Sequence, residues 1–170
     1  RHITFDSFRG GFDEPFDIAG ASVSLAHGLE WVGFFRSFDG LELPEAVERA
    51  LLEKGRIDGL KEDGLFEDYF YLAEERCARG GMFWPQVESV LTYNIMAPIY
   101  GEPYYECFQK AAKYYFGNFV DPEGGVHMYI DRNGVVTGRM KGDRWKCDYH
   151  SVRMCAEVLD REKGALYANA

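Results

Sequence analysis

Met82-Phe83-Trp84-Pro85-Gln86-Val87-Glu88 leads into an apolar stretch that extends to Ile95. Proline is well tolerated in the first turn of a helix, where its missing N–H would have no partner, so a helix is expected from about Pro85 to Ile95. Glu88 is the charged residue of this otherwise apolar helix. Its position indicates a helix that is covered by neighbours and turns one polar side chain toward a shared interior.

The same pattern, a polar residue on an apolar helix, recurs at regular distances along the chain. Glu88 follows His27 by about 60 residues, and His150 follows Glu88 at nearly the same distance. Pro44 and Pro103, which open the intervening helices, are also about 60 residues apart. Such a period fits a helical hairpin whose first helix faces a common interior and whose second helix covers it outside. The sequence therefore predicts an α/α toroid.

Hydrophobic periodicity and helix punctuation predict five helices in all. Their ranges are 22–38, 44–54, 85–95, 103–116 and 149–161. Asn133-Gly134 lies between two alternating runs and predicts a small β-hairpin within residues 126–140. Residues 58–81 are expected to form an irregular connection. The expected fold class is all-α with one hairpin, and no linker divides residues 1–170 into domains.

Composition and charge limit the classes of function. Apolar residues make up 46% and aromatic residues 16% of the 170 residues, which is enough to build a packed core. The net charge of -9 means that most of the surface repels nucleic-acid phosphates and anionic lipids. No apolar run approaches the ~20 residues that cross a bilayer. We therefore expect neither nucleic acid nor a membrane as a partner.

The cysteines Cys77, Cys107, Cys147 and Cys155 indicate the redox environment. They form no CxxC pair, and the spacing between the last two matches neither a zinc site nor a redox motif. Reduced thiols in a cytoplasmic protein are the expected state.

Two pairs of residues at helical spacing could bind a polar ligand. His27 and Glu30 are three residues apart, and Trp84 and Glu88 are four apart, so each pair lies on one helix face. A histidine with a carboxylate can move a proton or hold a sugar hydroxyl, and an aromatic ring beside a carboxylate suits a carbohydrate. The structural alternative is a core histidine, a core tryptophan and two solvated glutamates.

A third pair, His150 and Arg153, shares the first turn of the last expected helix. The N-terminal end of a helix favours a neutral imidazole, which can act as a base. His2 precedes every expected element, and His127 alternates within the expected hairpin. Both of these histidines are expected to be structural or exposed.

Three motifs occur in one order along the chain. Ala26-His27-Gly28-Leu29-Glu30-Trp31 comes first and Phe83-Trp84-Pro85-Gln86-Val87-Glu88 second. The third set comprises Asp121-Pro122-Glu123-Gly124-Gly125, the hairpin with Asp131 to Gly134, Lys141, Trp145, Tyr149-His150 and Arg153. In this order and spacing the motifs resemble those of the N-acylglucosamine 2-epimerase family, which includes cellobiose 2-epimerases and mannose isomerases. The resemblance covers about residues 20 to 160.

The resemblance implies an (α/α)6 barrel with a sugar site at its centre. Six hairpins of ~60 residues would need on the order of 360 residues, so residues 1–170 are expected to be the C-terminal portion of one such barrel. The chain starts at Arg1, and further helical hairpins are expected before it. Members of the family often form dimers, so a homodimer is an expected assembly.

The resemblance also implies roles for individual residues. His27 and His150 would be the catalytic pair that moves a proton at the carbon beside the carbonyl of an opened sugar. Glu30 and Glu88 would bind hydroxyls or orient the histidines. The remaining implied residues are Trp84 and Trp145, which would stack on the sugar, and Arg153, which would support His150. The substrate would be a mono- or disaccharide, and this chemistry requires no metal and no cofactor.

Two other functions remain open from the sequence. A noncatalytic sugar-binding or regulatory relative would keep the tryptophans and glutamates, but would have no need of His27 and His150 together. A glycoside-processing enzyme on the same type of barrel would need two carboxylates beside a glycosidic bond, for which Glu30 and Glu88 are the candidates. In that enzyme the two histidines would have no role.

Overall fold

The computed structural model describes residues 8–9, 14–15, 22–78, 80–142 and 148–168. Its helices are α1 (Leu25–Ser37), α2 (Glu45–Lys54), α3 (Phe83–Tyr100), α4 (Glu102–Tyr114) and α5 (Tyr149–Ala168). A π-helical turn follows α2 (η1, Gly55–Gly59), and another follows α4 (η2, Tyr115–Phe119). The strands are β1 (Phe8–Arg9), β2 (Glu14–Pro15), β3 (Ser22–Ser24), β4 (Tyr69–Tyr71), β5 (Arg76–Cys77), β6 (Gly81–Met82), β7 (Tyr129–Ile130) and β8 (Val136–Gly138).

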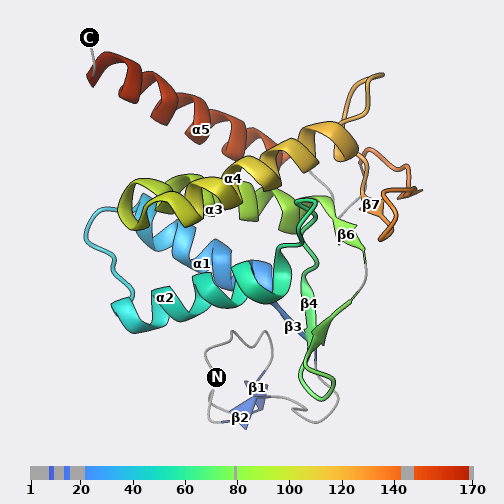
Figure 1. The fold of residues 1–170 in the computed structure, drawn as a ribbon, viewed down its shortest axis with the longest axis horizontal. Helices are drawn as coiled ribbons and strands as arrows, with labels where there is room; N and C mark the ends of the chain where they lie inside the picture. The colour runs from blue at the N-terminus through green and yellow to red at the C-terminus, as the bar shows by residue number, and fades with distance from the viewer. Residues whose placement is uncertain (1–7, 10–13, 16–21, 79, 143–147, 169–170) are drawn as a thin grey trace.

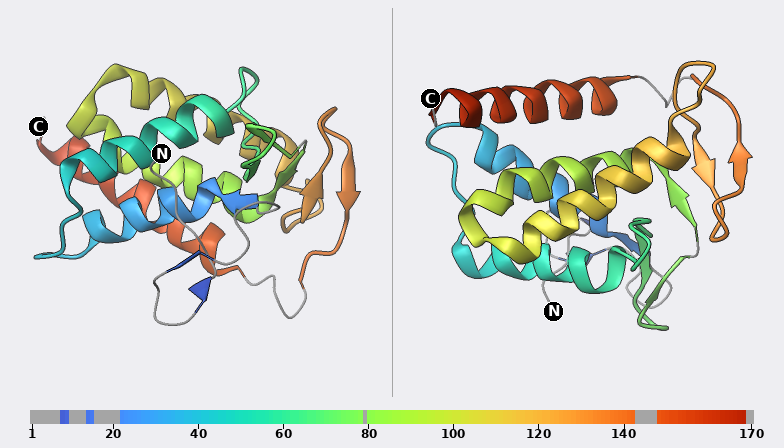
Figure 2. Two further views of the ribbon diagram at one scale, coloured as in Figure 1. Left: turned by 90° about the horizontal axis from the view of Figure 1, so that it is seen from below. Right: turned by 45° about the horizontal axis from the view of Figure 1, so that its top comes forward.

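The helices pack with α3 at their centre (Figure 1). Helix α1 lies against one side of α3 and α5 against another, while α2 packs on α1 and α4 packs on α3. Strand β3 runs directly into α1, and β6 runs directly into α3, so the two three-stranded sheets gather at the end where these helices begin (Figure 2). The fold is mostly helical with small sheets, which agrees with a fragment of a helical toroid.

Two parts of the chain repeat the same succession of elements. The first repeat, residues 22–77, contains β3, α1, α2, η1, β4 and β5, and the second repeat, residues 81–138, contains β6, α3, α4, η2, β7 and β8. The strands add in the order β3-β4-β5 and β6-β7-β8, all antiparallel. Ser24 pairs with Tyr69 in the first sheet and Met82 with Tyr129 in the second. The period of helical hairpins expected from the sequence is therefore present.

The register of the repeat differs from the expected one by about one helical turn. Helix α1 begins at Leu25 and α3 begins at Phe83, so Glu30 and Glu88 are both the sixth residue of their helices. The polar pattern pairs Glu88 with His27 instead. That pattern alone does not show where α1 begins, because the start is fixed by hydrogen bonds from a distant segment.

Several element boundaries differ from the predicted ones. The helix expected over 22–38 begins only at Leu25, because the three residues before it pair with β4. The helix expected over 85–95 extends from Phe83 to Tyr100 and ends where Gly101 adopts a φ of 84°. The expected hairpin is confirmed as β7 and β8. The interpretation of 58–81 as irregular was wrong for β4 and β5, which form an antiparallel pair within it. Strands of two or three residues are too short to show an alternating pattern.

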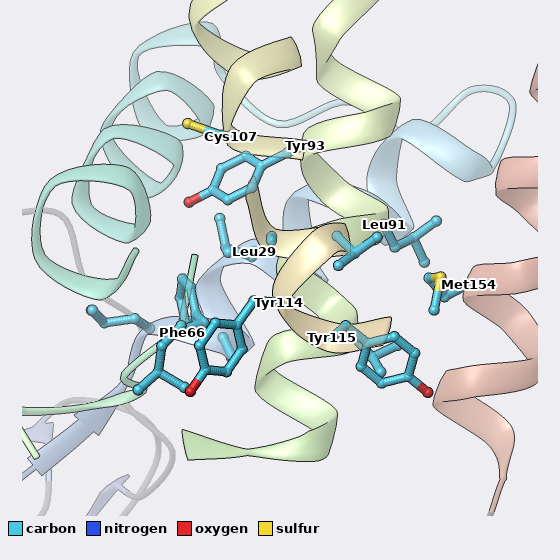
Figure 3. Close-up of a cluster of buried hydrophobic side chains, with 14 of the residues drawn as sticks. Leu29, Phe66, Leu91, Tyr93, Cys107, Tyr114, Tyr115 and Met154 are labelled. Atoms are coloured by element: carbon cyan, nitrogen blue, oxygen red, sulfur yellow. The ribbon is translucent and has the colours of Figure 1, made fainter. Parts of the chain in front are cut away.

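Much of the core lies between the helices (Figure 3). Its largest buried side chains include Phe66, Leu91, Tyr93, Tyr115 and Met154, all at most 2% exposed. Burying a large apolar side chain contributes on the order of 1.5–3 kcal/mol, so these residues hold α3 against α1, α4 and α5. No described helix is long and apolar enough to cross a membrane.

The described cysteines agree with the expected reduced thiols. Cys77, Cys107 and Cys155 are unpaired, and burial raises the pKa of the Cys77 thiol to about 12. Cys147 lies outside the described residues.

Candidate functional site

The start of α1 is fixed by a buried carboxylate that immediately precedes β4. Asp68 is 4% exposed, and its Oδ1 accepts a hydrogen bond of 2.7 Å from the backbone N–H of Ala26. The Ser24 hydroxyl donates to the same carboxylate at 2.9 Å and accepts from the backbone N–H of His27 at 3.1 Å. Because unpaired N–H groups are characteristic of helix starts, this network determines the residue at which the helix begins. His27 therefore lies in the first turn of α1.

His27 and His150 approach the same tryptophan from different helices. The His27 ring stacks on Trp84 with centroids 5.0 Å apart and 29° between the planes. The His150 ring lies 5.6 Å from Trp84, at 35°. Trp84 is the second residue of α3, so the first turns of α1, α3 and α5 meet around its indole. Two imidazoles at one aromatic ring are suited to act on one ligand.

Glu88 connects His150 to Arg153. The Glu88 side chain has no exposed surface, and its Oε1 lies 2.7 Å from His150 Nδ1 while its Oε2 lies 3.4 Å from Arg153 Nη1. A buried carboxylate is costly unless it is paired and hydrogen-bonded, and these two contacts provide that pairing. The Arg153 guanidinium also lies 4.3 Å from the centre of the Phe34 ring on α1 and 2.9 Å from Glu157. Glu88 thus fixes the orientation of the His150 ring.

Glu30 is the half-buried carboxyl group of the cluster. Burial raises its pKa, and the neighbouring Glu88 raises it further, whereas His150, His27 and Arg153 oppose the shift. The net direction is upward, so Glu30 binds a proton more readily than a free glutamate does. When it is protonated, a carboxyl group can donate a hydrogen bond to a hydroxyl oxygen, and it can also accept one from a hydroxyl O–H.

Three residues of the cluster could hold a metal ion. Glu30, Glu88 and His150 each offer one ligand atom, and these atoms lie within 4.8 Å of one another. Two carboxylates and an imidazole are suitable ligands for a divalent cation. Both oxygens of Glu88 already contact nitrogen atoms of His150 and Arg153, and the guanidinium would repel a cation. The present contacts therefore favour a hydrogen-bonded cluster.

A cavity of about 520 Å³ lies beside this cluster, between α1 and α5. Phe34, Tyr149 and Arg153 are among the residues that line it. Its size is within the range of small-molecule sites, and the Tyr149 ring lies 5.0 Å from that of His150. A ligand could therefore lie within reach of both the cavity and the histidine.

The described site contains six of the seven residues proposed from the sequence. They are His27, Glu30, Trp84, Glu88, His150 and Arg153. Trp145 and His2 lie outside the described residues. His127 lies apart from this cluster and faces Asp121 at 3.7 Å, in agreement with its expected structural role.

The sequence did not reveal two buried polar residues that hold the site together. Asp68 is one, and Gln86 on α3 is the other, with 0% exposure. Gln86 accepts a bond from Phe66 N at 2.7 Å and donates to the carbonyls of Gly64 and Ala111 at 2.8 and 3.0 Å. Gln86 was visible within a motif, but helical spacing gives no indication of partners that lie in other segments of the chain.

The fold is similar to those of several sugar-converting enzymes. A cellobiose 2-epimerase from Spirochaeta thermophila matches with a TM-score of 0.77 and 21% identity over 92% of this chain. One from Bacillus thermoamylovorans matches with a TM-score of 0.74 and 19% identity over 91% of the chain. A D-mannose isomerase matches with a TM-score of 0.69 and 19% identity over 81%. No protein-family model and no curated protein matches the sequence.

These similarities confirm, at the level of the fold, the resemblance that the motifs indicated. The chain spans 41% of the Spirochaeta structure, 40% of the Bacillus structure and 37% of the isomerase structure. It therefore corresponds to about two-fifths of the length of these enzymes. Identities of 19 to 21% support a common fold and leave the reaction to be argued from the site.

Proposed function

We propose that this chain carries the catalytic histidines of a sugar 2-epimerase or aldose–ketose isomerase of the N-acylglucosamine 2-epimerase type. Residues 1–170 would form the C-terminal portion of its (α/α)6 barrel. The observation that carries the proposal is the meeting of His27 and His150 at Trp84, 5.0 and 5.6 Å from its ring. These histidines are far apart in sequence, and a structural role for either would not require the other.

The reaction removes the proton from the carbon beside the carbonyl of an opened sugar. That C–H bond is a weak acid, so the step needs a positioned base and hydrogen-bond donors to the developing enediolate oxygen. Glu88 accepts from Nδ1–H of His150, which leaves Nε2 of the same ring as the base. The 2.7 Å bond also stabilises the imidazolium that forms when His150 takes the proton.

His27 would return a proton to the enediolate from its own side of the sugar. Return to the same carbon on the opposite face gives the 2-epimer, and return to the neighbouring carbon gives the ketose. Both reactions use the same groups, so the position of the intermediate between His27 and His150 decides the product. The proposal therefore includes either reaction class.

The remaining residues would hold the saccharide. Glu30, with its raised pKa, would share a proton with a sugar hydroxyl, and Trp84 would contact the C–H face of the ring. Arg153 would position Glu88 and thereby His150. Trp145 would stack on the sugar, as the motif resemblance implies. No step of this scheme uses a metal or an organic cofactor.

A glycoside-processing enzyme is less well supported. It needs two carboxylates on opposite sides of a bond, about 5–5.5 Å apart for retention or 6.5–9.5 Å for inversion. The Glu88 side chain has no exposed surface and lies against His150 and Arg153. It is therefore not exposed to a glycosidic oxygen.

Hydrogen exchange in heavy water tests the proposal directly. The full-length protein is incubated with mannose, N-acetylmannosamine or cellobiose, and deuterium at the carbon beside the carbonyl is followed by NMR. We expect incorporation with at least one sugar, and we expect His150→Ala to abolish it while the folded structure is retained. His127→Gln, which changes a histidine outside the site, is the matched control and should keep full exchange.

Two results would contradict the proposal. Exchange into none of the sugars by the wild-type protein would favour a noncatalytic sugar-binding relative, provided that binding of a sugar is still measured. Full exchange by His150→Ala would remove His150 from the catalytic role.

A further inference from the structure

We propose that Asp68 is a positioning residue for His27, because its carboxylate sets the start of the helix that carries this histidine. The inference rests on the proposed function, since it assigns to Asp68 the task of holding one of the two proton-transfer groups. Asp68 comes after both α1 and α2 in the chain and is not part of any motif that the sequence presented.

Asp68 is hydrogen-bonded to the first turn of α1 at successive residues. Its backbone carbonyl accepts from Leu25 N at 3.3 Å, and its carboxylate accepts from Ala26 N at 2.7 Å. The Ser24 hydroxyl bridges the carboxylate to His27 N, with distances of 2.9 and 3.1 Å. Asp68 is 4% exposed, so these bonds are made away from competing water.

The helix of the second repeat starts without such a carboxylate. Met128 lies at the position equivalent to Asp68, and its backbone carbonyl accepts from Phe83 N at 3.1 Å, as Asp68 does from Leu25. Within the described part of the chain, no side chain caps α3 at Met82. Helix α3 nevertheless begins at the equivalent place and runs on to Tyr100.

The difference between the repeats coincides with the location of the histidine. In α1 the first turn contains His27, whereas the residue at the equivalent position of α3 is Pro85, which carries no titratable group. A buried charge is expensive, and it is found here at the helix whose first turn must hold an imidazole 5.0 Å from the Trp84 ring. A misplacement of about 1 Å in such a group can cost on the order of a hundredfold in rate.

A direct test compares the position of the His27 ring in the wild-type protein and in Asp68→Ala. The stacked indole shields the ring protons of His27, so their NMR signals are expected upfield in the full-length protein. Asp68→Ala should move the His27 signals toward ordinary values and leave those of His150, which belongs to another helix, in place. Asp68→Asn keeps one carboxamide oxygen for Ala26 N and should give an intermediate shift.

The kinetic expectation follows the same order. The kcat of deuterium exchange should fall about 10- to 100-fold for Asp68→Ala and less for Asp68→Asn. KM should change little, because the residues proposed to hold the sugar lie on other helices or on later turns of α1. Met128→Ala, the equivalent change in the second repeat, should alter neither the His27 signals nor kcat.

Two outcomes would overturn the inference. One is an Asp68→Ala protein that is less stable but keeps wild-type His27 signals and kcat, since a merely stabilising residue would behave in this way. The other is an equal displacement of the His27 and His150 signals, which would show general loosening. Absence of exchange in the wild type would refute the proposed function, and the NMR shift would still decide whether Asp68 positions His27.

Discussion

The two repeats have the same backbone plan but different side chains at equivalent places. Glu30 and Glu88 are the sixth residues of α1 and α3, yet Glu88 is fully buried between His150 and Arg153, whereas Glu30 is half-buried at the edge of the cluster. Gly28 in α1 is matched by Gln86 in α3, which binds the turn of the first repeat. The same backbone fold thus accommodates different residues at equivalent positions, and the neighbouring elements determine the burial and the hydrogen-bond partners of each.

Two equivalent pairs of polar side chains show the same freedom. In the first repeat Lys61 lies 3.2 Å from Glu67, and in the second Asp121 lies 3.7 Å from His127. The backbone bonds are equivalent, since Glu67 N donates to Gly59 O and His127 N to Phe119 O at 2.9 and 2.8 Å. The acidic residue is the second member of the pair in the first repeat and the first member in the second repeat, while the backbone turn is the same. The backbone conformation therefore does not depend on which of the two positions carries the acidic side chain.

The two equivalent glutamates give the largest expected difference in activity. Glu88→Gln removes the carboxylate beside Arg153 Nη1, while the Glu157 contact of Arg153 remains, and it removes the charge that supports a protonated His150. We therefore expect deuterium exchange to fall about 10³-fold. Glu30→Gln keeps the hydrogen-bonding groups for a hydroxyl and should fall less. Exchange rates of both variants with the same sugar measure the contrast, and a larger loss for Glu30→Gln would reverse the assigned roles.

Glu30→Gln should also stabilise the protein at neutral pH. The folded-state pKa of Glu30 is raised, so ionising it costs stability as the pH rises through that value. Removing the charge removes this cost, and urea unfolding at pH 7 and pH 4 should show a gain confined to the higher pH. An equal gain at both values would contradict the assigned cause.

The contrast between Gly28 and Gln86 predicts the largest loss of stability. Gln86→Leu removes three buried hydrogen bonds and leaves Phe66 N, Gly64 O and Ala111 O without that partner, which should cost about 3 kcal/mol or more. Ser89→Ala on the same helix loses one local bond, to Gln86 O, and should cost about 1 kcal/mol. The denaturant midpoints of the two variants measure this difference in stability, and an equal loss in both would contradict the importance of the Gln86 bonds to distant segments.

A buried carboxylate on α2, in the first repeat, should contribute to the response to acid. Glu48 on α2 is 1% exposed and binds Arg36 at 2.7 Å through each oxygen and Tyr100 at 2.6 Å. Burial alone would raise the pKa of Glu48, but the hydrogen bonds from Arg36 and Tyr100 lower it overall. This contribution to stability is present above the unfolded-state pKa of about 4.3 and is lost as the pH falls through the lower folded-state value.

Glu48→Gln is therefore expected to flatten the fall in stability at low pH. Tm measured between about pH 5 and pH 3 should drop less steeply in the variant than in the wild type. Glu45→Gln, on the exposed face of the same helix, is the matched control and should keep the wild-type slope. Parallel slopes for wild type and Glu48→Gln would show that another group dominates the acid response.

The smallest difference is expected from the two equivalent side-chain pairs, Lys61 with Glu67 and Asp121 with His127. Glu67 is 9% exposed and also accepts from Gly80 N at 3.2 Å, so Glu67→Gln should cost about 1 kcal/mol. Asp121→Asn should have a smaller effect that disappears in high salt, because its contacts to Lys141 and His127 are near the surface. Denaturant unfolding of both variants at low and high salt measures these two losses of stability. A loss in Glu67→Gln that also disappeared in high salt would contradict the difference expected between the two variants.

Much of the site could be predicted because its residues lie in short motifs at helical spacing. His27 with Glu30, Trp84 with Glu88 and His150 with Arg153 each share a helix face, and spacing along a helix follows from local geometry. The three motifs therefore contain the described residues of the candidate site. The repeat predicted from the polar pattern differs by one turn from the observed one, because that pattern does not indicate where α1 begins.

Asp68 and the strands of the first sheet could not be predicted in the same way. The strands have two or three residues, too few to show a period, and they exist because β3 and β5 pair with β4 once the chain has folded back on itself. Asp68 appeared to be one of several acidic residues in a loop, and nothing near it in sequence distinguishes it from Asp63 or Glu62.

The sequence by itself determined the helical period, the apolar faces and the set of side chains able to move a proton. All of these depend on spacing within a few turns of a helix, which local backbone geometry fixes. The tertiary structure decided which ends of the helices meet, which glutamate is buried and which carboxylate holds the first turn of α1. Those outcomes depend on hydrogen bonds between segments far apart in the chain, such as Ser24 with Asp68 and Glu88 with Arg153, and such bonds form only once the elements have packed.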